Sequence, residues 1–464
     1  MIRAFSLATV LALASTPISA QDEPLEWLAG DHHVHSEFSA GWQKNHRDPT
    51  AAPLPVLGGD SAHTTLQNAR AAQRFGLSWM VTTDHGGPRH SELNRRIAWP
   101  VLEDVRETLR EEGSPLILFY GLEFDTPGGE HSTLMMPRSS HERDDLYAIE
   151  SGFAERDGWP TDPARDTKPR MLDALRAMAK LSPAPLLIAN HPSRTATGRE
   201  QWGLHAPDEF RQWMDAAPGV AIGMEGIPGH QAAHSRDGLD NNHVSRGLYG
   251  GYATLGGFDQ MTAILGGAWD AMLAQGRHWW ITGSSDSHGH SSEGGADYWP
   301  GEYTKTWVHA RRTPDAIMDG LRQGRVFVTT GDLVTGLSLT LDNGRAVELG
   351  STITMNSHVP QTLTIRLALG GKPEAMLDHL DIIVGSRKAD GQPDTRILKR
   401  FTLSRAQREK GTAEFYLSLA EMHHASYLRL RGTNTLQGEP LPDAIDEDPW
   451  ADLWFYSNPI WFGK

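Results

Sequence analysis

The chain has 464 residues, a hydrophobic content of 39% and a formal net charge of −15. Its length exceeds that of one ordinary domain, so we expect a large domain followed by a smaller one. The acidic excess argues against a protein that coats nucleic acid, because such binding depends on Lys and Arg, and a small-molecule substrate fits better. The absence of cysteine excludes disulfides, thiolate metal ligands and a cysteine nucleophile. Any metal must therefore be held by His and carboxylates.

The first twenty residues, MIRAFSLATVLALASTPISA, contain a single basic residue, an apolar stretch and a run of small residues. This layout is typical of a cleaved secretory signal peptide, and we expect cleavage after Ala20. A buried N-terminal helix is the alternative interpretation. No apolar run reaches the ~20 residues that span a bilayer. We therefore expect a periplasmic or secreted protein without stable membrane insertion.

Short apolar runs alternate with longer amphipathic segments between residues 27 and 331. The runs are nearly continuous in hydrophobicity, as in strands buried on both faces of a parallel sheet. Such a βαβ series favours a closed or nearly closed barrel over an open sheet. The expected strands are 27–35, 77–85, 116–124, 185–191, 220–227, 278–288 and 325–331, and the expected helices are 64–75, 91–112, 169–181, 207–216, 258–275 and 313–323.

The pattern changes after about residue 335. Segments such as GLSLTLDNGRAVEL and TLTIRLALGG alternate apolar and polar residues between turn-rich breaks, which is typical of half-exposed antiparallel strands. The acidic stretch at 141–145 is interpreted as a solvated loop. The predicted domains are a signal peptide at 1–20, an α/β barrel at 21–334 and a small β-sandwich at 335–464.

Polar residues collect at the ends of the expected strands. The motifs HVH, TDH, GLE, NHP, MEG and SDSH each lie at or directly after the carboxyl end of a strand candidate. In parallel α/β architectures, this edge of the sheet collects the catalytic groups. His33 and His35 are two residues apart on a strand, so both side chains leave the same face and can converge on one ion. Asp286 and His288 repeat that spacing, and imidazole with carboxylate ligands suits Zn, Mn or Fe.

In this order, the motifs resemble the PHP family of metal-dependent hydrolases, named for its polymerase and histidinol phosphatase members. Within it, they are similar to the secreted branch of CehA/McbA-like metallohydrolases. The resemblance covers about residues 27 to 331, and the motifs RVFVTTG and SNPIW extend it more weakly toward the end. It implies a distorted (β/α)7 barrel with two or three divalent metal ions at the carboxyl edge, followed by a β domain. It also implies hydrolysis by a metal-bound hydroxide.

The resemblance further implies three sets of metal ligands. The first set consists of His33, His35, Glu123 and Asp286. The second set shares Glu123, because the two oxygens of a carboxylate can bridge two cations, and it adds His131 and His191; the third set consists of His85 and His288. Two ions at about 3.5–4 Å lower the pKa of a shared water and stabilise charge on the attacked group. The carboxylates expected to take part in catalysis are Asp84, Glu123 and Asp286.

The sequence departs from the resemblance at the third ion. Family members that bind three ions often place another histidine or a carboxylate shortly after the HxH pair, whereas Ala40 and Gly41 occupy that stretch here. The third ion then requires a substitute ligand, and the candidates are His46, His63 and Asp84. For Asp84, orientation of a neighbouring imidazole is the alternative role.

Several polar residues near the motifs have two interpretations. His32 faces away from His33 on a regular strand and is expected to pack in the interior or behind the ligands. Glu225 either joins the site, where we expect it to contact the substrate, or holds a helix or loop. Glu130 is expected to be a loop charge. Three histidines in a Gly-rich stretch are expected at the surface: His230, His234 and His243.

Substrate contacts are expected from residues near the strand ends. Arg194 closely follows the NHP motif, and its planar guanidinium can bind a phosphate or carboxylate in a bidentate manner. A surface ion pair is the alternative, and Arg89 and Lys305 are weaker candidates. The segments 41–63 and 226–257 are longer than their connections require. We expect them to form the pocket wall.

Three functions are compatible with these observations. Hydrolysis of a small phosphate ester is the leading hypothesis, because clustered divalent cations neutralise phosphoryl oxygens. Hydrolysis of a carbamate, carboxylic ester or amide is the runner-up, since the same hydroxide attacks a carbonyl and few Arg or Lys residues flank the motifs. The third is a non-catalytic periplasmic binding or scaffold protein. That function predicts the loss of several ligands, whereas most of them are present.

Overall fold

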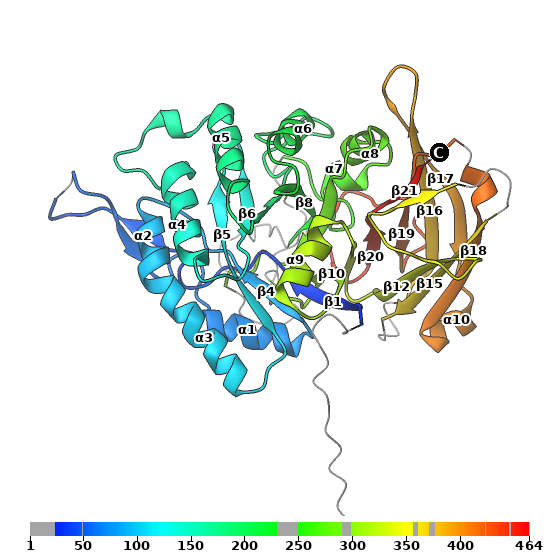
Figure 1. Ribbon diagram of the computed structural model, residues 1–464, viewed down its shortest axis with the longest axis horizontal. Helices are drawn as coiled ribbons and strands as arrows, with labels where there is room; N and C mark the ends of the chain where they lie inside the picture. Colours follow the sequence, from blue (N-terminus) through cyan, green and yellow to red (C-terminus); the bar gives the residue numbers. More distant parts are fainter. Residues whose placement is uncertain are drawn as a thin grey trace, which may run out of the picture.

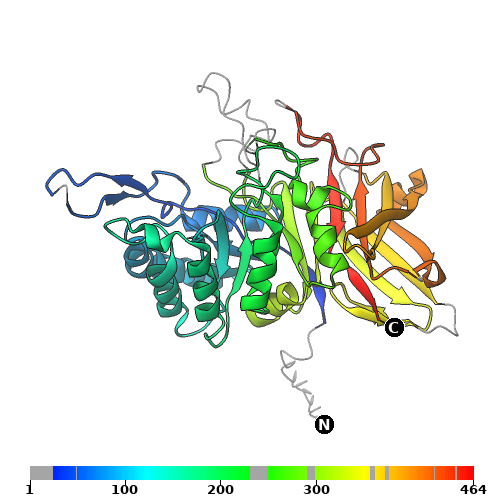
Figure 2. The same cartoon turned by 90° about the horizontal axis from the view of Figure 1, so that it is seen from above.

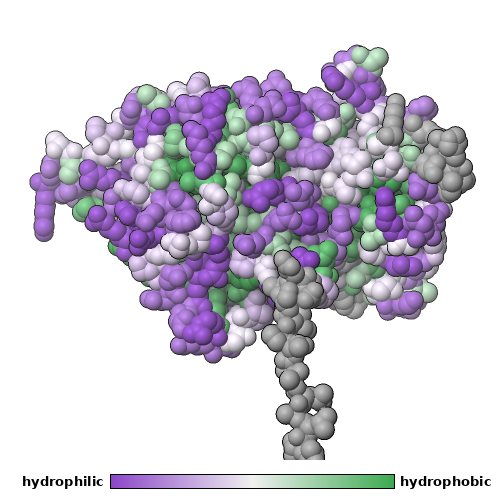
Figure 3. Space-filling view, in the orientation of Figure 1, coloured by the Kyte–Doolittle hydropathy of each residue, from purple (hydrophilic) through white to green (hydrophobic). Residues whose placement is uncertain are grey.

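The structure is a computed structural model that describes residues 24–48, 50–229, 249, 251–289, 298–355, 361–370, 376–422, 424–444 and 447–463. The expected signal peptide, His230, His234 and His243 lie outside these ranges. Helices surround the strands of the N-terminal part, whereas strands dominate the C-terminal part (Figure 1). Within the described ranges, no helix combines the length and the apolar character that crossing a membrane requires. The face seen in Figure 3 is mostly hydrophilic.

A mixed sheet forms the centre of the N-terminal part. All neighbouring pairs in its first seven strands are parallel except those of β6, which is antiparallel to both β5 and β7. The strand order is β1 (Glu26–Asp31), β4 (Trp79–Thr82), β5 (Ile117–Asp125), β6 (His131–Met135), β7 (Leu186–Ala189), β8 (Ala221–Pro228) and β9 (Trp280–Ser284).

The two ends of this seven-strand series meet beyond β1 and β9. Val34 and Ser287 pair in an isolated parallel bridge, the His35 amide donates to the Ser287 carbonyl at 3.0 Å, and the Asp286 amide donates to the His33 carbonyl at 3.0 Å. These backbone bonds place the HVH and SDSH motifs side by side, although about 250 residues separate them in the chain.

Helices cover the outside of the series, and local sequence explains where several of them begin. Thr64, Thr167 and Thr313 each accept a backbone N–H at a helix start, and Thr64 forms a capping box with Gln67. The helices are α1 (Thr65–Arg74), α2 (His90–Leu93), a π-helical turn (Asn94–Ala98), α3 (Trp99–Glu111), α4 (Glu142–Phe153), α5 (Lys168–Met178), α6 (Pro207–Ala216), α7 (Gln260–Ala263), α8 (Ala268–Ala274) and α9 (Pro314–Arg322).

Most predicted elements are confirmed, and four expectations need correction. The stretch 141–145 is not a loop, because its acidic residues form the first turn of α4. Their negative charges interact favourably with the positive end of the helix dipole. The helix expected at 258–275 divides into α7 and α8 at Gly266, whose φ is +76°. The sheet is not wholly parallel, since two strands were not predicted: β6, and β10 (Thr304–Ala310), which is antiparallel to β1. The strand predicted at 325–331 is β11 (Val326–Thr330), which is antiparallel to β10.

The C-terminal strands divide between two sheets. A separate antiparallel sheet contains β13 (Ala346–Val347), β12 (Val334–Leu341), β15 (Thr362–Leu369) and β18 (Thr412–Ser418). The other strands continue the large sheet, because β20 (Trp454–Ser457) pairs with β11. They are β14 (Thr352–Thr354), β16 (His379–Arg387), β17 (Pro393–Thr402), β19 (Tyr427–Thr433) and β21 (Ile460–Gly463), and α10 (Arg405–Lys410) precedes β18.

A buried ion pair joins the two parts. Asp270 on α8 accepts two hydrogen bonds of 2.9 Å from Arg429 on β19, and the Tyr427 hydroxyl donates a third at 2.9 Å. The C-terminal strands are therefore anchored to the helical part by a fully desolvated contact.

The small ribbon of β2 (Gly41–Gln43) and β3 (Leu54–Val56), drawn in dark blue in Figure 2, projects from the opposite end of the molecule.

Candidate metal centre

The carboxyl edge of the seven-strand series brings together every metal ligand that the sequence predicts. The antiparallel β6 contributes as well, because its first residue lies at the edge where the parallel strands end. The gathered residues are His33 and His35 after β1, His85 after β4, Glu123 in β5, His131 at the start of β6, His191 after β7, and Asp286 and His288 after β9.

Glu123 lies at the centre of the gathered residues and is fully buried. Its Oε1 lies 2.9 Å from His191 Nε2, 3.1 Å from His33 Nε2 and 3.2 Å from His131 Nδ1. Burial alone raises the pKa of Glu123, but the charges of His131, His85 and His33 outweigh it and hold the pKa well below its usual value. The carboxylate is therefore ionised at neutral pH.

The second oxygen of Glu123 faces other imidazoles. Oε2 lies 2.8 Å from His85 Nδ1 and 3.5 Å from His35 Nε2. Asp286 Oδ1 lies 3.2 Å from both His33 Nε2 and His35 Nε2, which are themselves 3.0 Å apart. Ligand atoms that share one Zn²⁺ at about 2.0–2.1 Å are separated by about 3 Å, so these spacings match a common cation.

One close approach has no explanation in hydrogen bonding. His85 Nδ1 and Glu123 Oε2 are 2.8 Å apart, yet both atoms are buried without a hydrogen-bond partner among the described residues. Buried polar atoms are rarely left unsatisfied, because desolvating them costs about 1–3 kcal/mol. A cation between the two lone pairs satisfies both, so the donor set fits a metal ion.

Asp60 joins the centre from the long segment 41–63. Its Oδ2 lies 3.5 Å from His288 Nε2 and 3.6 Å from His85 Nε2, and the ring of His288 stacks on that of His35 at 3.9 Å. Burial raises the pKa of Asp60, but the hydrogen bond and charge of His288 and the charge of His85 lower it to about 2. Together with His35, these groups form a third possible ligand set.

Sequence reasoning missed Asp60. The predicted substitutes are His46, which is exposed, His63, whose ring packs on Trp299 at 4.2 Å, and Asp84, whose carboxylate is bonded to Ser36 and Ser39. The segment 41–63 was expected to line the pocket and contains only two carboxylates, Asp48 and Asp60. The small number of carboxylates in this segment was the signal that the sequence offered. An acidic side chain from a loop that lines the pocket can supply the ligand that is missing where Ala40 stands.

Hydrogen bonds behind the imidazoles determine which nitrogen is free to bind a cation. His33 Nδ1 lies 2.8 Å from Glu225 Oε1, and His288 Nδ1 lies 2.8 Å from the Asp286 main-chain carbonyl. Both partners only accept hydrogen bonds, so each Nδ1 must carry a proton. The Nε2 of each ring faces the carboxylates and is the nitrogen available to a cation.

Ser39 imposes the same tautomer on His35. The hydroxyl donates its single proton to Asp84 Oδ1 at 3.1 Å and accepts the His85 amide at 3.0 Å. Ser39 must therefore also accept from His35 Nδ1, which lies 2.8 Å away. Asp84 contacts Ser36 and Ser39 and acts on His35 through Ser39.

Two residues of the centre have unusual backbone angles. His191 has φ +28° and Asp286 has φ +50°, a region that non-glycine residues rarely occupy and that costs about 1–3 kcal/mol each. The His191 amide donates to Glu225 Oε2 at 2.6 Å, and the Asp286 amide bonds to the His33 carbonyl. With these backbone bonds, the His191 ring faces Glu123 and the Asp286 carboxylate faces His33 and His35.

Asn190 and His32 occupy the interior next to the centre. Asn190 Nδ2 donates to Glu123 Oε1 at 3.1 Å, and its Oδ1 accepts the amide and the hydroxyl of Thr133 at 2.9 Å each. His32 bonds to the hydroxyls of Thr133 and Thr282 at 3.2 and 2.8 Å. Asn190 is a neutral support for the ionised carboxylate that sequence reasoning did not single out, although it directly precedes a predicted ligand.

The residues expected to bind substrate have different environments. Arg194 is partly exposed and pairs with the buried Glu130 at 2.9 Å. Burial, followed by the charge of Arg194, holds the pKa of His191 well below its usual value. Glu225 is fully buried behind His33. Of the weaker candidates, Arg89 is exposed and Lys305 is buried against Asp332 at 2.7 Å.

These contacts define overlapping groups of histidines and carboxylates that are able to hold metal ions. Their shared features are mutual distances compatible with coordination and imidazole nitrogens that face buried carboxylate oxygens. The chain matches none of the known protein-family models, and a search of curated proteins likewise finds no match.

Proposed function

We propose that the protein is a metal-dependent hydrolase that acts on a small phosphate ester. The observation that carries the proposal is the position of Glu123, whose two oxygens face two separate groups of imidazoles. A carboxylate in this position is suited to bridge two cations. Bound divalent cations would lower the pKa of coordinated water and neutralise charge on the attacked group.

The first two ligand sets are those that the family resemblance implies, and Asp60 joins the third through its distances to His85 and His288. One ion would be held by His33, His35, Glu123 and Asp286, and a second by Glu123, His131 and His191. A third would be held by His85, His288 and Asp60. The histidine and carboxylate donors suit Zn, Mn or Fe, and two or three ions are expected.

This arrangement supports membership of the PHP family and of its CehA/McbA-like secreted branch. Supporting features are the seven-strand series, whose ends meet at the Val34–Ser287 bridge, and the ligands at the carboxyl edge of its strands. A distorted (β/α)7 barrel followed by a β-sandwich is the fold that we propose on this basis. Within it, Asp84 acts as a support for His35, and Glu225 as a support for His33.

Arg194 is the residue that we assign to substrate binding. Its guanidinium is partly exposed beside the centre and retains N–H donors beyond the one that contacts Glu130. A phosphate oxygen at the metal ions would accept from those donors. Positive charge at this position also stabilises the negative charge that develops on the attacked group.

One observation favours the second candidate, hydrolysis of a carbamate, carboxylic ester or amide. The described cations nearest the centre are already paired: Arg194 with Glu130, and Arg156 with Asp125. A neutral carbonyl substrate needs no free cation. The two candidates therefore differ in their dependence on Arg194.

The test combines metal analysis with two substrates. We expect two or three equivalents of metal in the purified protein, and turnover of p-nitrophenyl phosphate that a chelator abolishes and added metal restores. Turnover of 1-naphthyl methylcarbamate instead, unaffected by Arg194→Ala, would select the second candidate. Protein without metal, and without activity on either substrate after metal addition, would refute a hydrolase and favour a binding or scaffold protein.

A further inference from the structure

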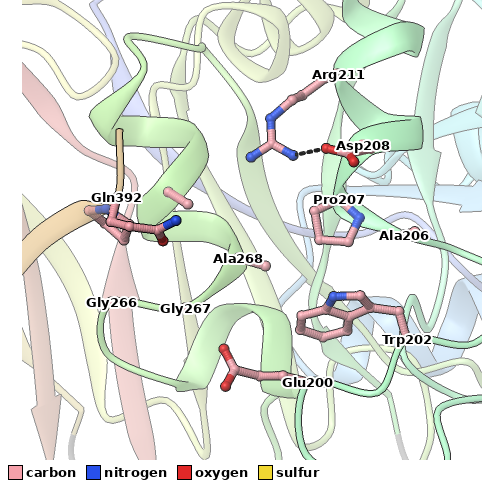
Figure 4. A pocket seen from close by; sticks show the side chains of 12 residues that line it. Glu200, Trp202, Ala206, Pro207, Asp208, Arg211, Gly266, Gly267, Ala268 and Gln392 are labelled. Carbon is pink, nitrogen blue, oxygen red and sulfur yellow. Dashed lines mark hydrogen bonds and ion pairs between the residues drawn. The ribbon is translucent and has the colours of Figure 1, made fainter. Parts of the chain in front are cut away.

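A pocket outside the metal centre lies between α6, α8 and the turn that connects β16 to β17 (Figure 4). Its volume is about 310 Å³, which is at the lower end of the range for small-ligand sites. Its walls come from both parts of the chain, because Arg211 lies on α6, Ala268 on α8 and Gln392 in the C-terminal turn. None of its lining residues contributes to the proposed metal ligands.

The polar groups of the pocket converge from several sides. Figure 4 shows Glu200 and Trp202 below, Arg211 above and Gln392 across from them. Within the described residues, the Glu200 carboxylate, the Gln392 amide and the Trp202 indole N–H make no hydrogen bond. These groups are therefore available to a ligand.

Arg211 keeps part of its hydrogen-bonding capacity. Its Nε donates to Gln275 at 3.0 Å and its Nη1 to Asp208 at 2.7 Å, which leaves the second terminal nitrogen for another acceptor. Asp208 neutralises the guanidinium charge. Arg211 is thus a hydrogen-bond donor to the pocket rather than an anchor for an anion.

The charges exclude two classes of ligand. With Glu200 and Asp208 against Arg211, the pocket carries one net negative charge, which disfavours a phosphate or carboxylate. An organic cation would be attracted to the ring of Trp202 and the carboxylate of Glu200. It accepts no hydrogen bonds, however, so it would leave the N–H donors of Arg211 and of the indole without acceptors. A neutral ligand with both donors and acceptors matches all four groups.

We propose that this pocket binds a neutral saccharide. Hydroxyl groups both donate and accept, so they can satisfy Glu200, Gln392, Arg211 and the Trp202 N–H together. The apolar face of a sugar ring can pack against the indole of Trp202 and against the alanines that line the pocket, which are Ala206, Ala268 and Ala271. The pocket would hold a glycan, or a glycosylated substrate, while leaving the metal centre free.

Titration calorimetry on the purified full chain tests this proposal with cellobiose, choline and inorganic phosphate as probes. We expect heat from cellobiose alone that depends on the pocket, with affinity lowered about tenfold by Trp202→Ala, because the stacking contact is lost. Trp202 is partly buried, so Glu200→Gln and Gln392→Ala serve as variants at exposed positions, with a smaller loss expected. Trp159→Ala, at a half-buried tryptophan outside the pocket, is the matched control.

Three results would overturn the proposal. The first is the absence of cellobiose binding to the wild-type protein. The second is binding that none of the three pocket variants changes. The third is binding of choline or phosphate, but not cellobiose, that Trp202→Ala removes. Metal content and hydrolysis are measured on the same samples and are expected to be unchanged, so failure here is distinguishable from failure of the proposed hydrolase.

Discussion

The two sides of the metal centre differ in exposure and in origin. On the inner side, the side chains of His33, His35 and His191 are 0–1% exposed and follow the ends of central strands. On the outer side, His85, His288 and Asp60 are 20%, 29% and 43% exposed, and Asp60 belongs to a long loop. The inner side is built into the sheet, whereas the outer side is open to solvent and to a substrate.

The support behind the imidazoles differs in the same way. His33 is backed by Glu225 and His35 by Ser39, each through a buried side chain. His288 Nδ1 faces a main-chain carbonyl of its own segment instead of a buried side chain from another element. Rigid support raises the affinity of a metal site, because less ordering is required when the ion binds. We therefore expect the inner ions to bind more tightly than an outer one.

The largest effect is expected from the inner carboxylates and imidazoles. Glu123→Gln removes a charge shared by two groups of imidazoles, and His35→Ala or Asp286→Asn removes a ligand of the first ion. Each variant should lose hydrolysis by a factor of at least about 10³ while keeping its circular dichroism spectrum. Near-normal turnover by any of the three would contradict the bridged metal centre.

Ser39→Ala should have a smaller effect on the inner side. Loss of the hydroxyl leaves His35 Nδ1 without its acceptor, so the ring can rotate or change tautomer. We expect metal affinity to fall about 10–100-fold, measured by competition with a chelator. Ser36→Ala is the matched control, because the Ser36 hydroxyl bonds to the same Asp84 carboxylate, whereas the His35 ring bonds to Ser39. Equal losses in both variants would show that the effect comes from Asp84 itself.

Asp60→Asn tests the outer side. The amide keeps the shape of the side chain but loses the charge between His85 and His288, so about one equivalent of metal should be lost and the remaining equivalents retained. We expect kcat/KM to fall about tenfold or less. Asp48→Asn, at an exposed residue of the same segment whose carboxylate accepts hydrogen bonds from Thr50, should retain full metal content. Loss of all metal in Asp60→Asn would show that the two sides are not independent.

The same contrast explains what sequence alone could predict. The inner ligands were accessible because strand periodicity places His33 and His35 on one face and Asp286 follows a recognisable strand. The outer His288 was accessible through its spacing from Asp286. His131 followed only from the family resemblance, since the polar strand HSTLM gives a weak signal. Asp60 and Ser39 depend on how a loop folds back over the sheet. No short-range pattern encodes that path, so the sequence narrows the choice to Asp48 or Asp60 in segment 41–63 and gives no signal for Ser39.

A buried histidine outside the ligand sets connects pH to the inner side. His90 Nδ1 lies 2.5 Å from Glu150 Oε1, and its Nε2 lies 3.2 Å from the carbonyl of Phe38, the residue before Ser39. Burial lowers the pKa of His90, but the charge and hydrogen bond of Glu150 outweigh it and raise the pKa to about 9. Protonated His90 therefore holds the Phe38 carbonyl in place at neutral pH.

This raised pKa gives the smallest predicted effect, and its sign is fixed by linkage. A group whose pKa rises on folding contributes stability that is complete below its ordinary value of 6.5 and is lost as the pH passes about 9. The free energy of unfolding, measured in denaturant at pH 6 to 10, should therefore fall with rising pH. His90→Gln should be less stable at pH 6 and should show a smaller slope. Metal affinity at neutral pH should change little in this variant, because Ser39 keeps its own bonds to Asp84 and His35. An unchanged slope would mean that the His90–Glu150 contact does not hold the charge, and that the stretch bearing Ser39 is fixed by Asp84 alone.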